Sequence, residues 1–75
     1  MAKRDRTLSA FGLNVLRRRE SKGLSQEKLA EKAELDRTYI SGIERGVRNP
    51  GLLSLVRLAK ALGVTTAELC GGIDG

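Results

Sequence analysis

Apolar residues in this chain recur at three- and four-residue intervals within short segments, and a glycine or a capping residue closes each segment. This spacing is typical of short amphipathic helices, because a helix brings every third and fourth side chain onto one face. No strand pattern accompanies it. The sequence therefore predicts an all-α fold with five helices. They span residues 7–21, 26–33, 37–45 and 52–62, and a short segment that opens at residue 65.

Residues that favour helix ends stand at the boundaries between these segments. Ser25 and Asp36 are good N-caps for the second and third helices. Thr65 and Glu68 have the spacing of a capping box, which predicts the start of the fifth helix. In the fourth helix, one side is apolar and begins at Leu52.

The size of the chain limits what it can do. Its 75 residues make one small domain, whose core provides only about 3–5 kcal/mol. Cys70 is the single cysteine, so no disulfide can form within the chain. Histidine is absent, which excludes a histidine general base and a histidine zinc site. We therefore expect no enzyme activity, no metal site, no cofactor and no small-molecule ligand.

The distribution of apolar residues argues against a membrane or secretory segment. No apolar run approaches the ~20 residues of a membrane-spanning helix, and the N-terminus lacks the apolar stretch of a signal peptide. A lone cysteine also suits a reducing compartment. These features predict a cytoplasmic protein without membrane contact. We expect a flexible basic arm over residues 1–6, a folded domain over residues 7–70 and a frayed tail over residues 71–75.

Positive charge is concentrated near the N-terminus. The net charge is +5, and residues 1–22 hold seven basic and two acidic residues, whereas residues 23–75 are balanced. A basic segment attracts polyanions such as nucleic acid and makes their binding salt-dependent. The alternative is that the charge only keeps the protein soluble.

The second and third predicted helices are the most informative pair, because a tight turn joins them. Ile40 and Ile43 point to one side of the third helix. The other side carries small polar and basic residues: Arg37, Thr38, Ser41, Gly42 and Arg45. Short side chains let a backbone approach a ligand surface closely, and arginine, serine and threonine can bond to base edges in the DNA major groove. The pattern predicts a helix that lies in the major groove, although Thr38 and Ser41 alone also suit an ordinary solvent-facing surface.

Residues 11–69 resemble the lambda-repressor-like helix-turn-helix family, also called the xenobiotic-response-element family. The matching motifs are Gly23-Leu-Ser-Gln26, Leu29-Ala30, Tyr39-Ile40-Ser41, Ile43-Glu-Arg-Gly46, Arg48-Asn-Pro50, Leu58-Ala-Lys-Ala-Leu-Gly63 and Glu68-Leu69. More narrowly, residues 35–45 resemble the controller proteins of restriction–modification systems. The resemblance implies a compact five-helix DNA-binding domain whose second and third helices form the helix-turn-helix. It also implies a homodimeric transcriptional regulator that binds palindromic operators in double-stranded DNA.

The resemblance assigns roles to particular residues. Three side chains of the third helix would read bases: Arg37, Thr38 and Ser41. Others would lie near the phosphate backbone or the groove edges: Gln26, Tyr39, Arg45, Arg48 and Asn49. The fifth helix and nearby residues would form the dimer contact: Val64, Leu69, Cys70 and Ile73. Regulation would follow from occupancy, either by blocking a promoter or by contact with RNA polymerase.

Two positions depart from the family pattern. Glu34 occupies a turn position commonly held by glycine, so a left-handed backbone there would carry strain of about 1 kcal/mol. Arg18 falls on the inward stripe of the first helix, where an aliphatic residue is frequent. An inward arginine needs an acidic partner, and Glu44 is the candidate for this structural ion pair.

Other functions fit the same pattern. A phage-type repressor, or the antitoxin of a toxin–antitoxin pair, would use this fold on DNA as well. A protein-interaction module with the same helices, but without DNA reading, is the alternative from another class. The polar outward side of the third helix favours DNA, because an interaction module would carry an exposed apolar patch there.

Overall fold

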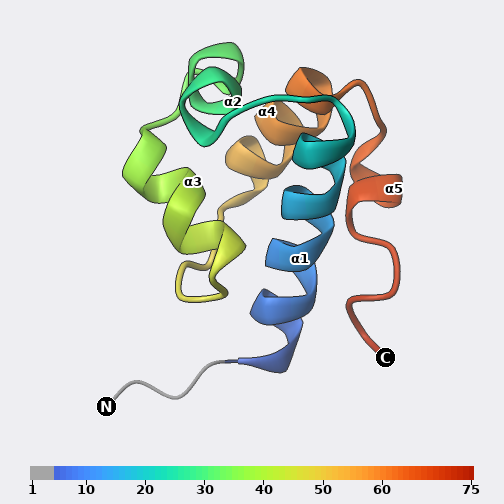
Figure 1. Ribbon diagram of the computed structural model, residues 1–75. Helices are drawn as coiled ribbons and strands as arrows, with labels where there is room; N and C mark the ends of the chain where they lie inside the picture. Colours follow the sequence, from blue (N-terminus) through green and yellow to red (C-terminus); the bar gives the residue numbers. More distant parts are fainter. Residues whose placement is uncertain (1–4) are drawn as a thin grey trace.

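The computed structural model describes residues 5–75, and α-helices make up most of this span (Figure 1). The helices are α1 (Arg6–Ser21), α2 (Gln26–Ala33), α3 (Arg37–Glu44), α4 (Leu52–Leu62) and α5 (Thr66–Leu69). Residues 5–75 contain no strand, so the predicted all-α fold is confirmed. Asp5 and Arg6 belong to the cap and first turn of α1. The rest of the predicted basic arm, residues 1–4, lies outside the described residues.

Side chains cap four of the five helices. The Asp5 carboxylate accepts hydrogen bonds from the first turn of α1, and Ser25 and Asp36 cap α2 and α3 in the same way. Thr65 and Glu68 form the predicted capping box, with N–H to side-chain oxygen distances of 2.9 and 3.0 Å. These bonds satisfy amide groups that have no partner within a helix.

The turn between α2 and α3 is left-handed at Glu34, with φ 57° and ψ 44°. The Leu35 N–H donates to the Ala30 carbonyl oxygen at 2.9 Å and closes the end of α2. Among residues 5–75, Glu34 is the only non-glycine residue with a positive φ. The left-handed turn considered for this position is therefore confirmed.

α1 lies in the middle of the molecule, with α3 on one side and α5 on the other (Figure 1). α2 contacts α3 and α4, and α5 contacts α4 and α1. The core between them is entirely apolar: Phe11, Val15, Leu29, Ala30, Ala33, Ile40, Ile43, Leu58, Ala59, Leu62 and Leu69. No helix among the described residues has the length and apolar character needed to cross a membrane.

The segment after α5 is tied to α1. Asn14 Nδ2 donates to the carbonyl oxygens of Leu69 and Gly71, each at 2.9 Å. Ile73 is half-buried and packs against the core. The predicted tail thus starts on the surface of the bundle, and the domain limits drawn from the sequence stay a prediction.

At Gly12, the backbone of α1 lies directly against the backbone at the end of α3. A Cβ atom on Gly12 would lie 2.8 Å from the Glu44 carbonyl oxygen and closer still to that of Ile43. After α3, Gly46 has a φ of 76°, and a Cβ there would lie 2.6 Å from Ser9 Oγ. Only glycine at position 12 allows so close an approach. The backbones of α1 and α3 therefore pack directly against each other at Gly12.

Candidate nucleic-acid interface

The outward side of α3 is polar and open. Ile40 and Ile43 are fully buried on the inner side. Arg37 and Thr38 are exposed, and Ser41 is half-buried. Helical geometry puts these three residues on the side away from the core. The predicted base-reading residues thus share one accessible surface.

Three arginines make this side of the molecule positive: Arg37, Arg45 and Arg48. All are exposed. Within residues 5–75, none of them has a carboxylate partner at ion-pair distance. Their positive charge is therefore available to an external anion.

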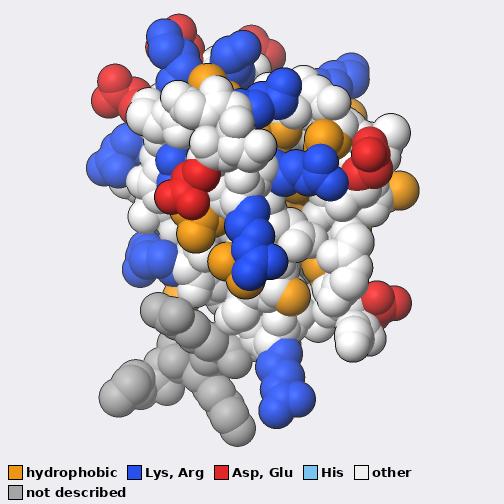
Figure 2. Space-filling view, turned by 45° about the vertical axis from the view of Figure 1, so that its right-hand side comes forward, with side chains coloured by type: hydrophobic (Ala, Val, Ile, Leu, Met, Phe, Trp, Pro, Cys, Tyr) orange, Lys and Arg blue, Asp and Glu red, His pale blue; other side chains and the backbone are white. Residues whose placement is uncertain are grey.

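The three arginines in the last turns of α1, Arg17, Arg18 and Arg19, do not add to this surface. Arg19 turns inward to Glu44, while Arg17 and Arg18 line a shallow polar hollow that Glu68 also lines. Figure 2, which brings the α5 side forward, shows Lys and Arg side chains mixed with carboxylates there. Among residues 5–75, the positive charge beside α3 therefore comes from α3 itself and the segment after it. The charge count along the sequence does not indicate this division.

A network behind the turn joins α1, α2 and α3. Arg19 Nε donates to Glu44 Oε2 at 2.6 Å, Arg19 Nη2 donates to Glu44 Oε1 at 3.0 Å, and Gln26 Nε2 donates to Glu44 Oε1 at 2.9 Å. Only 13% of the Arg19 side chain and 4% of the Glu44 side chain are exposed. The hydrogen bond to Glu44 raises the pKa of Arg19 despite burial, so the guanidinium stays charged. The network fixes how the three helices meet.

The predicted ion pair names the wrong arginine. Arg18 is exposed, and Arg19 is the partner of Glu44. A step of three from buried Val15 reaches Arg18, and a step of four reaches Arg19. Both steps fit a helical stripe, so spacing alone does not distinguish them. The position of α3 beside α1 decides in favour of Arg19.

Gln26 is held at both ends of its amide group. Its Nε2 donates to Glu44, and its Oε1 accepts a long hydrogen bond of 3.5 Å from Arg37 Nη1. Gln26 therefore connects the buried network to a predicted base-reading side chain. Its own contact with the DNA backbone stays a prediction.

The residues predicted near the phosphate backbone or groove edges reach the surface. Tyr39 is half-buried, while Arg45, Arg48 and Asn49 are exposed.

A residue from the segment after α3 changes the expected role of Gly42. Gly42 is buried, because the side chain of Arg48 lies across it. The expectation that Gly42 lets a ligand approach the α3 backbone is therefore wrong.

The predicted dimer residues divide between core and surface. Leu69 has no exposed area, because α5 turns it into the core of its own chain. The prediction is thus wrong for this side chain, which is not available to a second copy. Val64, Cys70 and Ile73 are half-buried and still reach the surface.

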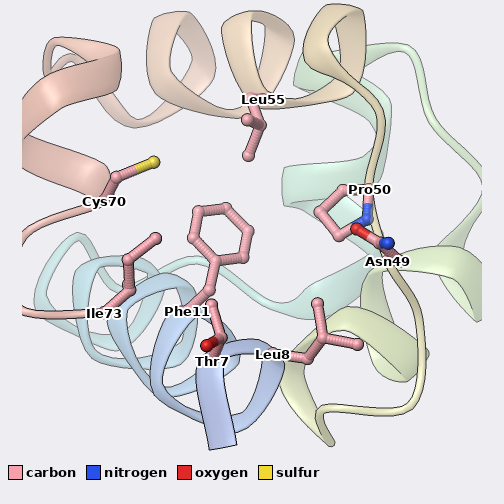
Figure 3. A pocket seen from close by; sticks show the side chains of 8 residues that line it. All are labelled: Thr7, Leu8, Phe11, Asn49, Pro50, Leu55, Cys70 and Ile73. Carbon is pink, nitrogen blue, oxygen red and sulfur yellow. The ribbon is translucent and has the colours of Figure 1, made fainter. Parts of the chain in front are cut away.

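The most exposed leucines lie at the start of α4 instead. Leu52 is 72% exposed and Leu53 is 74% exposed, so the apolar side that begins at Leu52 is not buried along its whole length. The buried residues of α4 lie in its second half, and its first turn extends beyond the core. In the chain, the two leucines stand between Pro50 and Leu55, which line a shallow apolar hollow (Figure 3). Its other apolar lining residues are Leu8, Phe11, Cys70 and Ile73.

Comparison with known proteins identifies the family to which this fold belongs. The helix-turn-helix family model matches residues 15–69. Control protein C.BamHI of Bacillus amyloliquefaciens is 52% identical over 60 residues, which cover 79% of this chain and 74% of that protein. The structure of the restriction-modification controller protein C.AhdI from Aeromonas hydrophila has a TM-score of 0.81 at 47% identity, covering 83% of this chain and 94% of that one. The structure of SinR in complex with DNA has a TM-score of 0.76 at 35% identity, covering 79% and 95%.

The chain belongs to the helix-turn-helix family, and α2 and α3 are the two helices of the motif. Its relatives include transcriptional regulators and control proteins of restriction–modification systems. The resemblance seen in the sequence is therefore confirmed.

Proposed function

We propose that this protein is a sequence-specific, DNA-binding transcriptional regulator, the controller protein of a restriction–modification system. α3 enters the major groove of double-stranded DNA with its polar side toward the bases. The observation that carries the proposal is this side of α3, which is accessible and bordered by arginines that have no carboxylate partner within residues 5–75. The similarity to C.BamHI and to SinR, whose structure contains DNA, supports it.

Base reading is assigned to three residues within the first five of α3. The N-terminal residues of a recognition helix contact base edges. Arg37 offers a fork of donors to O6 and N7 of guanine, and the hydroxyls of Thr38 and Ser41 bond to base edges. Gln26 steadies the Arg37 guanidinium from behind.

Phosphate binding is assigned to groups around that reading surface. Arg45 and Arg48 supply positive charge, and Tyr39 and Asn49 supply polar groups. The first turn of α2, at Gln26, adds free N–H groups and the positive end of a helix dipole. These contacts position the protein without selecting a sequence.

The regulator acts as a homodimer on a palindromic operator. Two copies place their α3 helices in successive major grooves, about 34 Å apart. Val64, Cys70 and Ile73 contribute to the contact, and the exposed Leu52 and Leu53 extend it, since large exposed apolar side chains mark interaction surfaces. In the cytoplasm, the bound dimer blocks a promoter or contacts RNA polymerase, according to where the operator lies.

Selection of bound duplexes from a random-sequence DNA pool tests DNA reading. We expect enrichment of a palindrome whose half-sites are about one helical turn apart. Absence of any enriched sequence would favour the protein-interaction module.

Sedimentation velocity over a range of protein concentrations tests the dimer. Leu53→Glu should shift the protein toward monomer, because a charge at an apolar contact is unfavourable. Leu13→Glu, on the partly exposed face of α1, is the matched control and should not. An unchanged dimer in Leu53→Glu would place the contact elsewhere.

A further inference from the structure

Gly42 is a buried glycine on the side of α3 that carries Thr38 and Ser41. The three heavy atoms nearest to a Cβ built at Gly42 all belong to Arg48. Arg48 Nε and Cδ would lie 3.4 and 3.5 Å from it, and Cγ would lie closer than 3.0 Å. The stem of Arg48 therefore rests in the space that any other residue at position 42 would fill.

Backbone conformation does not explain the glycine. Gly42 is absent from the residues of positive φ and lies within the regular part of α3. Glycine inside a helix is less favourable than alanine. What position 42 requires is the absence of a side chain, and the group that uses the space is Arg48.

Arg48 is otherwise free. Its side chain is exposed, and within residues 5–75 its guanidinium has neither a carboxylate within ion-pair distance nor a hydrogen bond to another side chain. It stands beyond the end of α3, yet its stem is directed back along the helix to Gly42. The packing of the stem thus determines where the charge lies.

We infer that Gly42 is a positioning residue that seats Arg48 on the outward side of α3, with its guanidinium directed at a DNA phosphate. The inference rests on the proposed function and deepens it. A long side chain loses rotamer freedom when it binds, and a seat that restricts it beforehand reduces that loss. A phosphate is the expected target because Arg48 lies beyond the end of α3, past the residues assigned to bases.

The test compares wild type with Gly42→Ala, Arg48→Ala and the double variant on the duplex enriched from the random pool. Arg48→Ala should weaken binding about tenfold and make the dependence on salt less steep by about one phosphate contact. Gly42→Ala should show most of both effects, because the added methyl group removes the Arg48 seat. The double variant should bind like Arg48→Ala alone. Gly51→Ala, where a Cβ meets nothing within 4 Å, is the control and should bind like wild type.

Two further measurements exclude a purely structural explanation. The midpoint of thermal unfolding of Gly42→Ala should equal or exceed that of wild type, because alanine favours the helix. In the free wild-type protein, nuclear Overhauser effects should connect the Gly42 Hα and Arg48 Hγ protons. Their absence would overturn the seat itself, without reference to DNA.

The outcomes separate the inference from the proposed function. If wild type enriches no duplex, both fail. If wild type binds and Gly42→Ala binds equally well, or the losses of the two single variants add in the double variant, the inference alone fails. A loss in Gly42→Ala that is confined to one base position, with an unchanged salt dependence, would overturn the assignment to phosphate.

Discussion

Gly12 and Gly42 are both enclosed glycines, but they lie on opposite sides of α3. Behind α3, a Cβ on Gly12 would press on the backbone carbonyl groups of Ile43 and Glu44. In front of α3, a Cβ on Gly42 would press on the side chain of Arg48. A side chain can move to another rotamer, whereas the backbone of a packed helix cannot. Gly12 thus determines how closely α3 packs against α1. Gly42 leaves room for the Arg48 side chain on the outward side of α3.

The arginines of the two regions differ in the same way. Behind α3, Arg19 is bound to Glu44 and largely buried. In front of it, Arg37 and Arg48 are exposed, and neither has a carboxylate partner within residues 5–75. The side of α3 that faces α1 is thus fixed by internal contacts, whereas the arginines on its outward side are available to bind an external partner.

The largest effect is expected for Gly12→Ala. α1 and α3 would have to move apart, and the free energy of unfolding should fall by about 3 kcal/mol. That loss would remove most of the stability of a domain of this size. Urea denaturation followed by circular dichroism measures it, with Gly42→Ala as the matched control of unchanged or greater stability. Equal stability of the two variants would contradict the claim that a side chain is tolerated at position 42 but not at position 12.

The next largest effect is expected for Glu44→Ala. It leaves the Arg19 guanidinium largely buried without its carboxylate, and the free energy of unfolding should fall by about 2–3 kcal/mol. Arg18→Ala is the matched control and should change it by less than about 0.5 kcal/mol. The same denaturation experiment applies. If Arg18→Ala lost as much as Glu44→Ala, Arg18 would have a structural role that the geometry does not show.

A smaller effect, on DNA rather than on stability, is expected for Arg37→Ala. Loss of its contact should weaken binding by about 1–3 kcal/mol and relax the preference at one base position. Arg17→Ala, on the α5 side, should cause a much smaller loss that is similar for all sequences. Fluorescence anisotropy with the enriched duplex and its single-base variants measures both. An unchanged sequence preference in Arg37→Ala would remove this residue from the reading surface.

The smallest effect concerns two helix caps in acid. Hydrogen bonds from the Thr38 hydroxyl and the Thr65 N–H hold the pKa values of Asp36 and Glu68 below their usual range. The unfolded chain therefore takes up protons first as the pH falls. The stabilisation is complete above about pH 5 and is lost as the pH falls through the lowered pKa values.

Asp36→Asn isolates one of these caps. Asparagine still caps the helix but does not titrate, so the fall in unfolding free energy below about pH 5 should become less steep. Both carboxylates are exposed, so the change should be modest. Urea denaturation at a series of pH values measures it, and an equally steep fall in the variant would contradict the role of Asp36.

Local signals predicted the helices closely. Ser25, Asp36 and Thr65 cap the helices that they were expected to cap. Glu34 adopts the left-handed conformation considered for its position. Each of these features depends on atoms within a few residues of one another, which is the range that a sequence pattern can describe.

The failures concern contacts between elements. Arg19, rather than Arg18, meets Glu44, which is 25 residues away along the chain. Leu69 is enclosed by helices that precede it, and Gly42 is covered by a residue from the following segment. A helical period leaves each of these choices open, because neighbouring positions satisfy it almost equally well.

The sequence by itself determined the order and approximate lengths of the helices, the side-chain caps of α2, α3 and α5, and the polar character of one side of α3. These properties arise from hydrogen bonds and side-chain spacing within single helices and turns. Only the tertiary structure decided which arginine is buried, which glycine lies under the side chain of Arg48 and which leucines remain exposed. The reason is that the packing of α1, α3, α4 and α5 sets the direction from which each of these positions is approached.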